Sequence, residues 1–103
     1  MKVYKFGGAS VRSAEGIRNI AHIVAKVNEP LFIVVSAMGK TTNAMEVVLE
    51  NFMKADRQSS LVKLAEVEDY HFQIISELFS QQQTGLNAVT PLFDELKDLI
   101  RDG

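Results

Sequence analysis

The sequence predicts an α/β fold in which parallel strands alternate with helices. Residues 2–6 and 31–36 have strand character, and a helical pattern over residues 14–27 separates them. The second strand segment is apolar on both faces, which is typical of a covered strand in a parallel sheet. Strand, helix and strand in this order form one βαβ unit, whose crossover we expect to be right-handed.

The composition is that of an ordinary water-soluble domain. The chain has 103 residues, of which 47% are apolar and 23% charged, and its net charge of −2 indicates neither a nucleic-acid nor an anionic-membrane partner. The absence of cysteine excludes disulfides and thiolate chemistry, and His22 and His71 are too far apart in sequence to suggest a metal centre. With no signal peptide and no apolar run of membrane-spanning length, we expect a cytoplasmic protein without a metal site of its own.

The loop after the first strand is the first candidate site. Lys5 lies at the carboxyl end of that strand, and Gly7 and Gly8 follow directly, just before a helical pattern. This order presents backbone N–H groups to a phosphate at a helix N-terminus. A strand lysine at such an edge is costly to bury unless an anion pairs with it. We therefore expect a phosphate site here, although a tight turn that requires glycine for a positive φ is an alternative.

The following helix and strand bring a second polar loop to the same edge. Ser13 is the expected N-cap of the helix over residues 14–27, and Pro30 lies in the break that ends it. The polar residues 36–43 then leave the carboxyl end of the second strand. In open α/β sheets this edge is where ligands bind, so we expect the two loops to converge.

From residue 44 onward the chain is predicted to be helical and carries little obvious chemistry. Three helical segments are expected, at residues 43–55, at residues 61–79 and from Leu86 or Val89 onward, with breaks at residues 56–60 and 81–85. Smaller expectations concern single residues of these segments: Ser59 or Ser60 as an N-cap, Pro91 in a first turn, His71 packed, and Glu66, Glu68 and Asp69 solvated.

A P-loop is the alternative interpretation of the second loop. Gly39, Lys40 and Thr41 match the end of that motif, but the position five residues before Gly39 holds Val34 where the motif needs glycine. A solvated loop lysine is therefore the better interpretation of Lys40.

Two stretches of the sequence resemble aspartate kinases. Residues 5–11 read Lys-Phe-Gly-Gly-Ala-Ser-Val, which is similar to the lysine-phenylalanine-glycine-glycine-threonine-serine-valine signature that opens that family. Val34, Val35, Ser36 and Ala37, followed by Thr41, Thr42 and Asn43, resemble its second signature. Related amino-acid kinases share the lysine and the paired glycines, so the first signature alone is only moderately specific. The resemblance to aspartate kinases rests on the two signatures together.

The resemblance implies ATP-dependent phosphorylation of the side-chain carboxylate of L-aspartate, the first step toward lysine, threonine and methionine. It implies an amino-acid-kinase (carbamate-kinase-like) α/β/α sandwich with a largely parallel sheet and a helical insertion. ATP would be accompanied by Mg²⁺, and the intact protein would be a homo-oligomer, with a dimer expected. The implied roles are Lys5 as the catalytic cation, Lys5, Phe6, Gly7, Gly8 and Ser10 at the ATP phosphates, and Ser36, Thr42 and Asn43 at the aspartate.

The chain departs from the family pattern in one residue and in length. Ala9 replaces the usual threonine. Alanine keeps any ligand contact made by the backbone N–H at this position, but it loses any contact made by the threonine hydroxyl, and affinity would then fall. Residues 1–103 would form part of a catalytic domain, with residues 1–43 as the βαβ unit and 44–103 as a helical segment. The rest of that domain and the regulatory ACT domains would be absent, so we expect the chain alone to be inactive. Another amino-acid kinase, acting on glutamate or a uridylate-type substrate, and a non-catalytic module that binds an anion or a partner remain alternatives.

Overall fold

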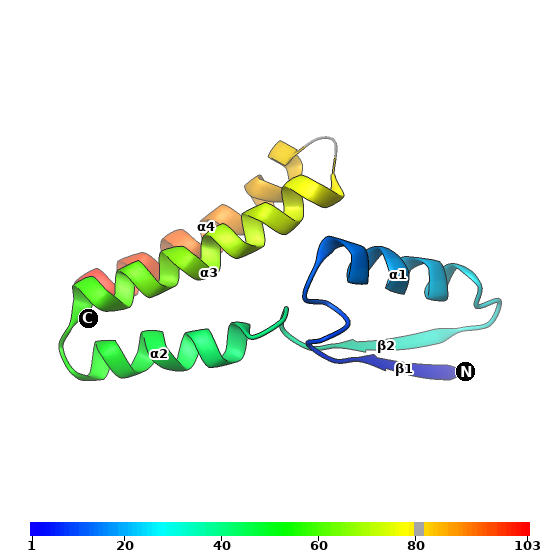
Figure 1. Ribbon diagram of the computed structural model, residues 1–103, viewed down its shortest axis with the longest axis horizontal. Helices are drawn as coiled ribbons and strands as arrows, with labels where there is room; N and C mark the ends of the chain where they lie inside the picture. Colours follow the sequence, from blue (N-terminus) through cyan, green and yellow to red (C-terminus); the bar gives the residue numbers. More distant parts are fainter. Residues whose placement is uncertain (80–81) are drawn as a thin grey trace. The chain divides into compact units, whose positions relative to one another are not determined.

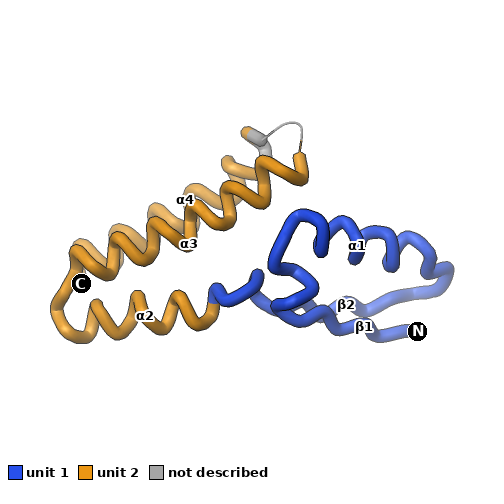
Figure 2. Tube along the Cα trace, in the orientation of Figure 1, with its two compact units in different colours: residues 1–41 blue, residues 42–103 orange. Residues whose placement is uncertain are grey.

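The computed structural model describes residues 1–79 and 82–103, which form two compact units (Figure 2). The first unit comprises residues 1–41 and the second residues 42–103. The described elements follow the order β1, α1, β2, α2, α3 and α4 (Figure 1). The prediction of a mixed α/β fold with parallel strands is confirmed.

The first unit contains a two-stranded parallel sheet. Strand β1 spans Lys2–Phe6 and pairs with β2 at Leu31–Val35, in a register that places Lys2 beside Leu31 and Phe6 beside Val35. Because the strands are parallel, their carboxyl ends lie at the same edge of the sheet. The predicted strand positions are therefore correct to within one residue.

Helix α1 spans Ala14–Ala25 and connects the two strands. Its N-cap is Ser13, as predicted, because the Ser13 hydroxyl accepts a hydrogen bond from the Gly16 N–H at 3.1 Å. The helix ends before the predicted Val27, because the N–H groups of Lys26 and Val27 donate to carbonyls only three residues back. Such tightened bonds are common in the last turn of a helix.

Strand β2 exposes apolar side chains on both of its faces. Phe32 is 57% exposed and Val35 56%, and these two residues point to opposite faces of the sheet. A strand of this composition normally has both faces covered. Only Val11 and Ala14 of this unit are buried apolar residues, so the unit has very little core of its own.

The second unit is a helical bundle with a compact apolar core. It contains most of α2 (Thr41–Met53), together with α3 (Arg57–Leu78) and α4 (Gln82–Asp102), and α3 and α4 form an antiparallel pair (Figure 1). The buried core residues come from all three helices: Val48, Leu64, Val67, Phe93 and Ile100. Within the described ranges, no helix combines the length and the apolar character needed to cross a membrane.

The connection between α2 and α3 differs from the prediction. Asp56, not Ser59 or Ser60, caps α3, because the Asp56 carboxylate accepts a hydrogen bond from the Ser59 N–H at 3.0 Å. Hydrogen bonds from the Ser59 backbone, and secondarily from its side chain, lower the pKa of Asp56 below its usual 3.8. Ser60 is instead fully buried, with its hydroxyl donating to the Val48 carbonyl at 2.8 Å. Sequence spacing did not distinguish a capping serine from one that joins two helices.

The break predicted at residues 81–85 is also wrong where the structure describes it. Residue 81 lies outside the described residues, but α4 already begins at Gln82 and includes Gly85. A Cβ at Gly85 would lie 2.7 Å from Cγ2 of Ile75 in α3, so this glycine allows the two helices to approach closely instead of ending one of them. Pro91 consequently lies inside α4 and not in its first turn. Packing of Phe93 and Ile100 in the core favours a continuous helix despite the missing N–H.

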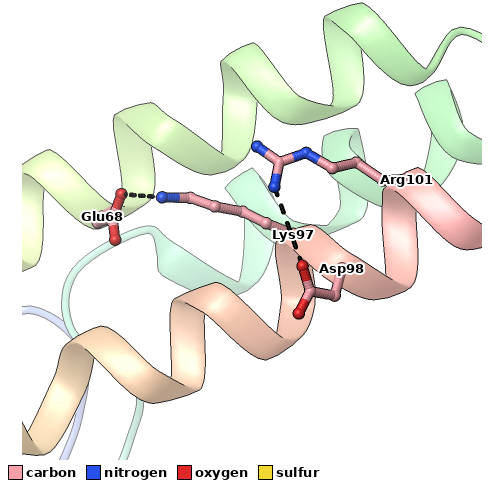
Figure 3. A network of polar contacts seen from close by, with 4 residues as sticks. All are labelled: Glu68, Lys97, Asp98 and Arg101. Carbon is pink, nitrogen blue, oxygen red and sulfur yellow. Dashed lines mark hydrogen bonds and ion pairs between the residues drawn. The ribbon is translucent and has the colours of Figure 1, made fainter.

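Two polar residues of α3 are packed against α4. Glu68 was predicted to be solvated, but it is only 8% exposed and accepts a hydrogen bond from the Lys97 ammonium at 2.8 Å (Figure 3). The pairing residue lies 29 positions away in sequence, which is why local charge pattern did not reveal it. His71 is packed, as expected: its Nδ1 donates to the Val67 carbonyl at 2.7 Å and its ring lies edge-on to Phe93.

Candidate functional site

The candidate site lies at the edge of the sheet where β1 and β2 both end. Residues 7–13 connect β1 to α1, and residues 36–40 connect β2 to α2. The Ser36 N–H donates to the Phe6 carbonyl at 3.0 Å, which extends the strand pairing into the second loop. The two loops therefore leave the sheet side by side.

The two loops are in direct backbone contact at Gly8 and Gly39. The Gly39 N–H donates to the Gly8 carbonyl at 3.2 Å, and a Cβ at Gly8 would lie only 2.7 Å from the Gly39 carbonyl oxygen. Any side chain at position 8 would thus force the loops apart. Gly39 itself has φ of 55°, in the left-handed region that glycine adopts without strain. The sequence predicted that the two loops converge, but it did not identify Gly39 and Gly8 as the residues in contact.

Gly7 differs from Gly8 because nothing in the protein occupies the space beside it. A Cβ at Gly7 would meet no atom within 4 Å. Neither Gly7 nor Gly8 has a positive φ, so a turn that requires left-handed glycines does not explain the pair. The close contact between the loops explains why position 8 holds glycine. The glycine at position 7 instead leaves open space at the exposed side of the loop.

The remainder of the first loop is fixed by short turns and a buried anchor. The N–H groups of Ser10 and Val11 donate to the carbonyls of Gly7 and Gly8 at 3.0 and 3.3 Å. Val11 is only 3% exposed and holds the loop against the unit, whereas Ala9 and Ser10 are exposed. The loop therefore exposes Gly7 and Ser10 to solvent, while its backbone is held by these hydrogen bonds and by buried Val11.

Lys5 is an exposed cation at this edge. It pairs in register with Val34, and in the described part of the chain no carboxylate forms an ion pair with it. The predicted cost of burying an unpaired lysine does not arise here, because the side chain reaches water. Phe6, on the opposite face, is half-buried with its ring edge-on to Tyr4 at 6.2 Å.

The polar residues of the second loop differ in whether their side chains are exposed or already hydrogen-bonded within the loop. Ser36 is exposed directly after β2. Thr41 begins α2 with its hydroxyl donating to the Met38 carbonyl at 2.6 Å, so that hydroxyl is engaged locally. Thr42 and Asn43 are exposed in the first turn of α2, where the second unit begins.

The P-loop alternative fails in the structure. Val34 occupies the position where that motif needs its first glycine, and it lies inside β2 in register with Lys5. Lys40 is exposed, in agreement with its interpretation as a solvated lysine.

The loops offer cations, hydroxyls and N–H groups but no acidic side chains. Residues 7–13 and 36–43 contain neither Asp nor Glu. Throughout the described ranges, no three His, Asp or Glu side chains come together as a metal-binding group. The arrangement is therefore suited to binding an anion.

Comparison with known proteins assigns a family to this arrangement. The sequence pattern of the amino acid kinase family matches residues 1–90. The chain belongs to the amino acid kinase family, and the two parallel strands and four helices of its described residues agree with the N-terminal portion of that fold.

Within this family the chain is related to aspartokinases. It is 30% identical over 102 residues to "Aspartokinase 1, chloroplastic" of Arabidopsis thaliana, covering 96% of this chain and 17% of that protein. It is 34% identical over 76 residues to "Aspartokinase" of Chlamydia pneumoniae, covering 74% of this chain and 16% of the relative. A bifunctional aspartokinase/homoserine dehydrogenase of Zea mays is 35% identical over 102 residues, covering 96% of this chain and 11% of that protein. The chain thus spans less than a fifth of the length of each of these three relatives.

Proposed function

We propose that this chain forms the phosphate-binding part of an aspartate kinase, which transfers the γ-phosphoryl group of ATP to the side-chain carboxylate of L-aspartate. The observation that carries the proposal is the Gly8–Gly39 contact, which joins the two signature loops beside the exposed Lys5. The relatedness to aspartokinases supports the choice of substrate.

In this proposal the first loop binds the ATP phosphates. The loop's own turns use the N–H groups of Ser10 and Val11, so a phosphate would accept hydrogen bonds from the N–H groups before them and from the Ser10 hydroxyl. The open space beside Gly7 gives a phosphate oxygen room to approach the backbone. Phe6 would contribute through its backbone, since its ring lies on the other face of the strand from Lys5.

Lys5 is the proposed catalytic cation. Phosphoryl transfer depends mainly on positioning and on stabilising negative charge on the transferring group. An aspartate carboxylate oxygen forms the new bond to the γ-phosphorus while the bond to the β,γ-bridging oxygen breaks, and ADP leaves with that electron pair. The Lys5 ammonium would stabilise the charge on the phosphoryl oxygens during this exchange. No protein nucleophile is needed.

Ser36, Thr42 and Asn43 are the proposed contacts to aspartate. Ser36 follows β2 directly, and Thr42 and Asn43 follow the same loop into α2. Their hydroxyl and amide groups can donate hydrogen bonds to a carboxylate. Thr41 is a poorer candidate because its hydroxyl already donates to Met38.

Mg²⁺ would accompany ATP and would be held by phosphate oxygens, not by these loops. Magnesium prefers carboxylate, phosphate and water oxygens, and the two loops supply no carboxylate. Complete activity is proposed for a polypeptide that joins this sequence to the remainder of a catalytic domain and to ACT domains, because the chain spans only 17% of the Arabidopsis relative. The dimeric state and the cytoplasmic location remain predictions for that polypeptide.

A chimera tests the proposal. The aligned segment of the Chlamydia pneumoniae aspartokinase is replaced with this chain, and ATP-dependent acyl-phosphate formation is measured by hydroxylamine trapping with L-aspartate, L-glutamate or UMP as acceptor. We expect activity with L-aspartate alone. Preference for L-glutamate or UMP would instead favour another kinase of the same family.

The chimera needs a control for folding. Its Lys5→Ala variant should retain the circular dichroism spectrum of the unmodified chimera and lose activity, whereas Lys2→Ala, at the other end of the same strand, should retain both. A folded chimera that is inactive with all three acceptors would contradict the proposed function. So would tight binding of Mg-ATP and aspartate by the 103-residue chain alone, because the proposal gives this chain only part of the site.

A further inference from the structure

The helical unit contains an apolar groove between α2 and α4 that the proposed function does not use. Its cavity of about 190 Å³ is lined by apolar side chains alone. Val48, Leu64 and Ile100 lie within the lining, together with Leu49 of α2 and with Leu96 and Leu99 of α4. We call this surface the α2/α4 groove.

The rim of the α2/α4 groove exposes large apolar side chains to water. Leu49 is 59% exposed and Leu99 62%. Leu49 also lines a second hollow, in which Met53 is 75% exposed. Contiguous exposed apolar residues of this kind mark interaction sites more often than isolated ones do.

The charges around the α2/α4 groove are predominantly negative. Glu46, Glu50 and Lys54 line the second hollow beside Leu49. On α4, Glu95 and Asp102 are exposed four residues before and three residues after Leu99, and these spacings place them on the same helix face.

The cations of α4 do not offset this charge. The Lys97 ammonium is 2.8 Å from the Glu68 carboxylate, and the Arg101 guanidinium is 3.9 Å from that of Asp98 (Figure 3). Each of these two cations is therefore matched by a carboxylate of its own. The carboxylates near the groove outnumber the ammonium groups as a result.

We propose that the α2/α4 groove binds a cationic amphipathic helix of another polypeptide. The apolar face of such a helix would cover Leu49 and Leu99, and its Lys or Arg side chains would approach Glu46, Glu50, Glu95 and Asp102. A second copy of this chain placed symmetrically on the groove would bring the same carboxylates against one another, which is unfavourable. The charge pattern thus selects a basic partner.

Two synthetic helical peptides test this inference with the 103-residue chain. One has about 18 residues, with leucine on one face and lysine on the other, and the second has glutamate in place of lysine. Binding is measured by fluorescence anisotropy of the labelled peptides at low and at physiological salt. We expect the cationic peptide to bind at least tenfold more tightly than the anionic one, with an affinity that falls as salt is added.

Matched variants locate the binding surface. Leu49→Asn should weaken binding of the cationic peptide roughly tenfold or more, whereas Val62→Asn, at an apolar α3 residue that is 53% exposed and outside the groove, should not. Glu50→Gln should weaken binding and reduce its salt dependence, whereas Glu66→Gln on α3 should do neither. Because these side chains are exposed, we expect all four variants to keep their circular dichroism spectra.

Results of two kinds, in peptide binding and in self-association, would overturn the inference. Three of them concern peptide binding. These are equal binding of the two peptides, binding that Leu49→Asn leaves unchanged in a folded chain, and no binding of the cationic peptide up to millimolar concentration. Self-association of the chain that Leu49→Asn abolishes would also contradict it, because a second copy would then occupy the groove.

Discussion

The two units of the chain differ in how they are stabilised. The helical unit buries a core drawn from three helices, with Leu64 fully buried at its centre. The first unit instead exposes most of its apolar strand β2, while its two loops are joined by the backbone hydrogen bond from Gly39 to Gly8. The candidate site is therefore ordered locally by glycines and turns, whereas the helical unit is ordered by the burial of apolar side chains.

The largest predicted effect concerns the chemistry of the first unit. In the chimera, Lys5→Ala should reduce kcat by roughly a hundred- to a thousandfold, because it removes a cation that stabilises charge in the transition state. The Lys5 side chain is exposed, so the midpoint of thermal unfolding should not change. A variant with nearly normal turnover would remove Lys5 from the mechanism.

The next effect concerns the core of the helical unit. Leu64→Ala should lower the free energy of unfolding by about 2–5 kcal/mol, because it leaves a cavity at a fully buried position. Urea denaturation followed by circular dichroism measures this loss. Val62→Ala, at an exposed α3 position, is the matched control and should cost much less. Similar losses for the two variants would mean that the helical unit is not held by the core described above.

The two adjacent glycines provide a sharper test of the loop contact. Gly8→Ala should destabilise the first unit by about 1–3 kcal/mol, because its Cβ would lie 2.7 Å from the Gly39 carbonyl oxygen. Gly7→Ala meets no atom within 4 Å, so it should leave stability nearly unchanged and affect only phosphate binding. Hydrogen exchange of the residue 7–13 backbone distinguishes these outcomes. Equal destabilisation by the two substitutions would contradict the loop contact.

The smallest effect lies at the end of α2. Ala55 has φ of 59°, and the Asp56 N–H donates to the Asn51 carbonyl at 2.9 Å, a helix ending in which glycine is preferred. Ala55→Gly should therefore stabilise the helical unit by up to about 1 kcal/mol. Ala88→Gly, inside α4, should have the opposite sign and cost about 0.5–1 kcal/mol. A loss of stability with Ala55→Gly, measured by urea denaturation, would show that the left-handed residue is not strained.

The sequence was most informative where structure depends on neighbouring residues. The β-branched segment at residues 31–36, the alternation in residues 2–6 and the Ser13 cap were predicted because each depends on local backbone preference. The beginning of α4 was not predicted, because Gly85 resembles a helix breaker until the neighbouring Ile75 is known. Its role depends on a contact between two helices.

The candidate site shows the same division. The loop composition and Lys5 were evident from the sequence, as was the edge of the sheet to which a parallel pairing brings both loops. The contact between Gly8 and Gly39 was not, because two glycines distant in sequence carry no signal that they touch. In the helical unit, the Glu68–Lys97 pair was also not predicted. Its two residues are distant in sequence, and a charge cluster on one helix face is usually solvated.

Amide chemical-shift mapping with Mg-ATP tests most directly whether the first loop binds the ATP phosphates beside Lys5, in backbone contact with the second loop. We predict shifts at residues 7–10 and at Gly39, whose N–H donates to the Gly8 carbonyl, with weak, roughly millimolar affinity because the chain supplies only part of the site. The shifts should disappear in Lys5→Ala and persist in Lys2→Ala. Shifts confined to the helical unit, or loop shifts that Lys5→Ala leaves unchanged, would contradict the account.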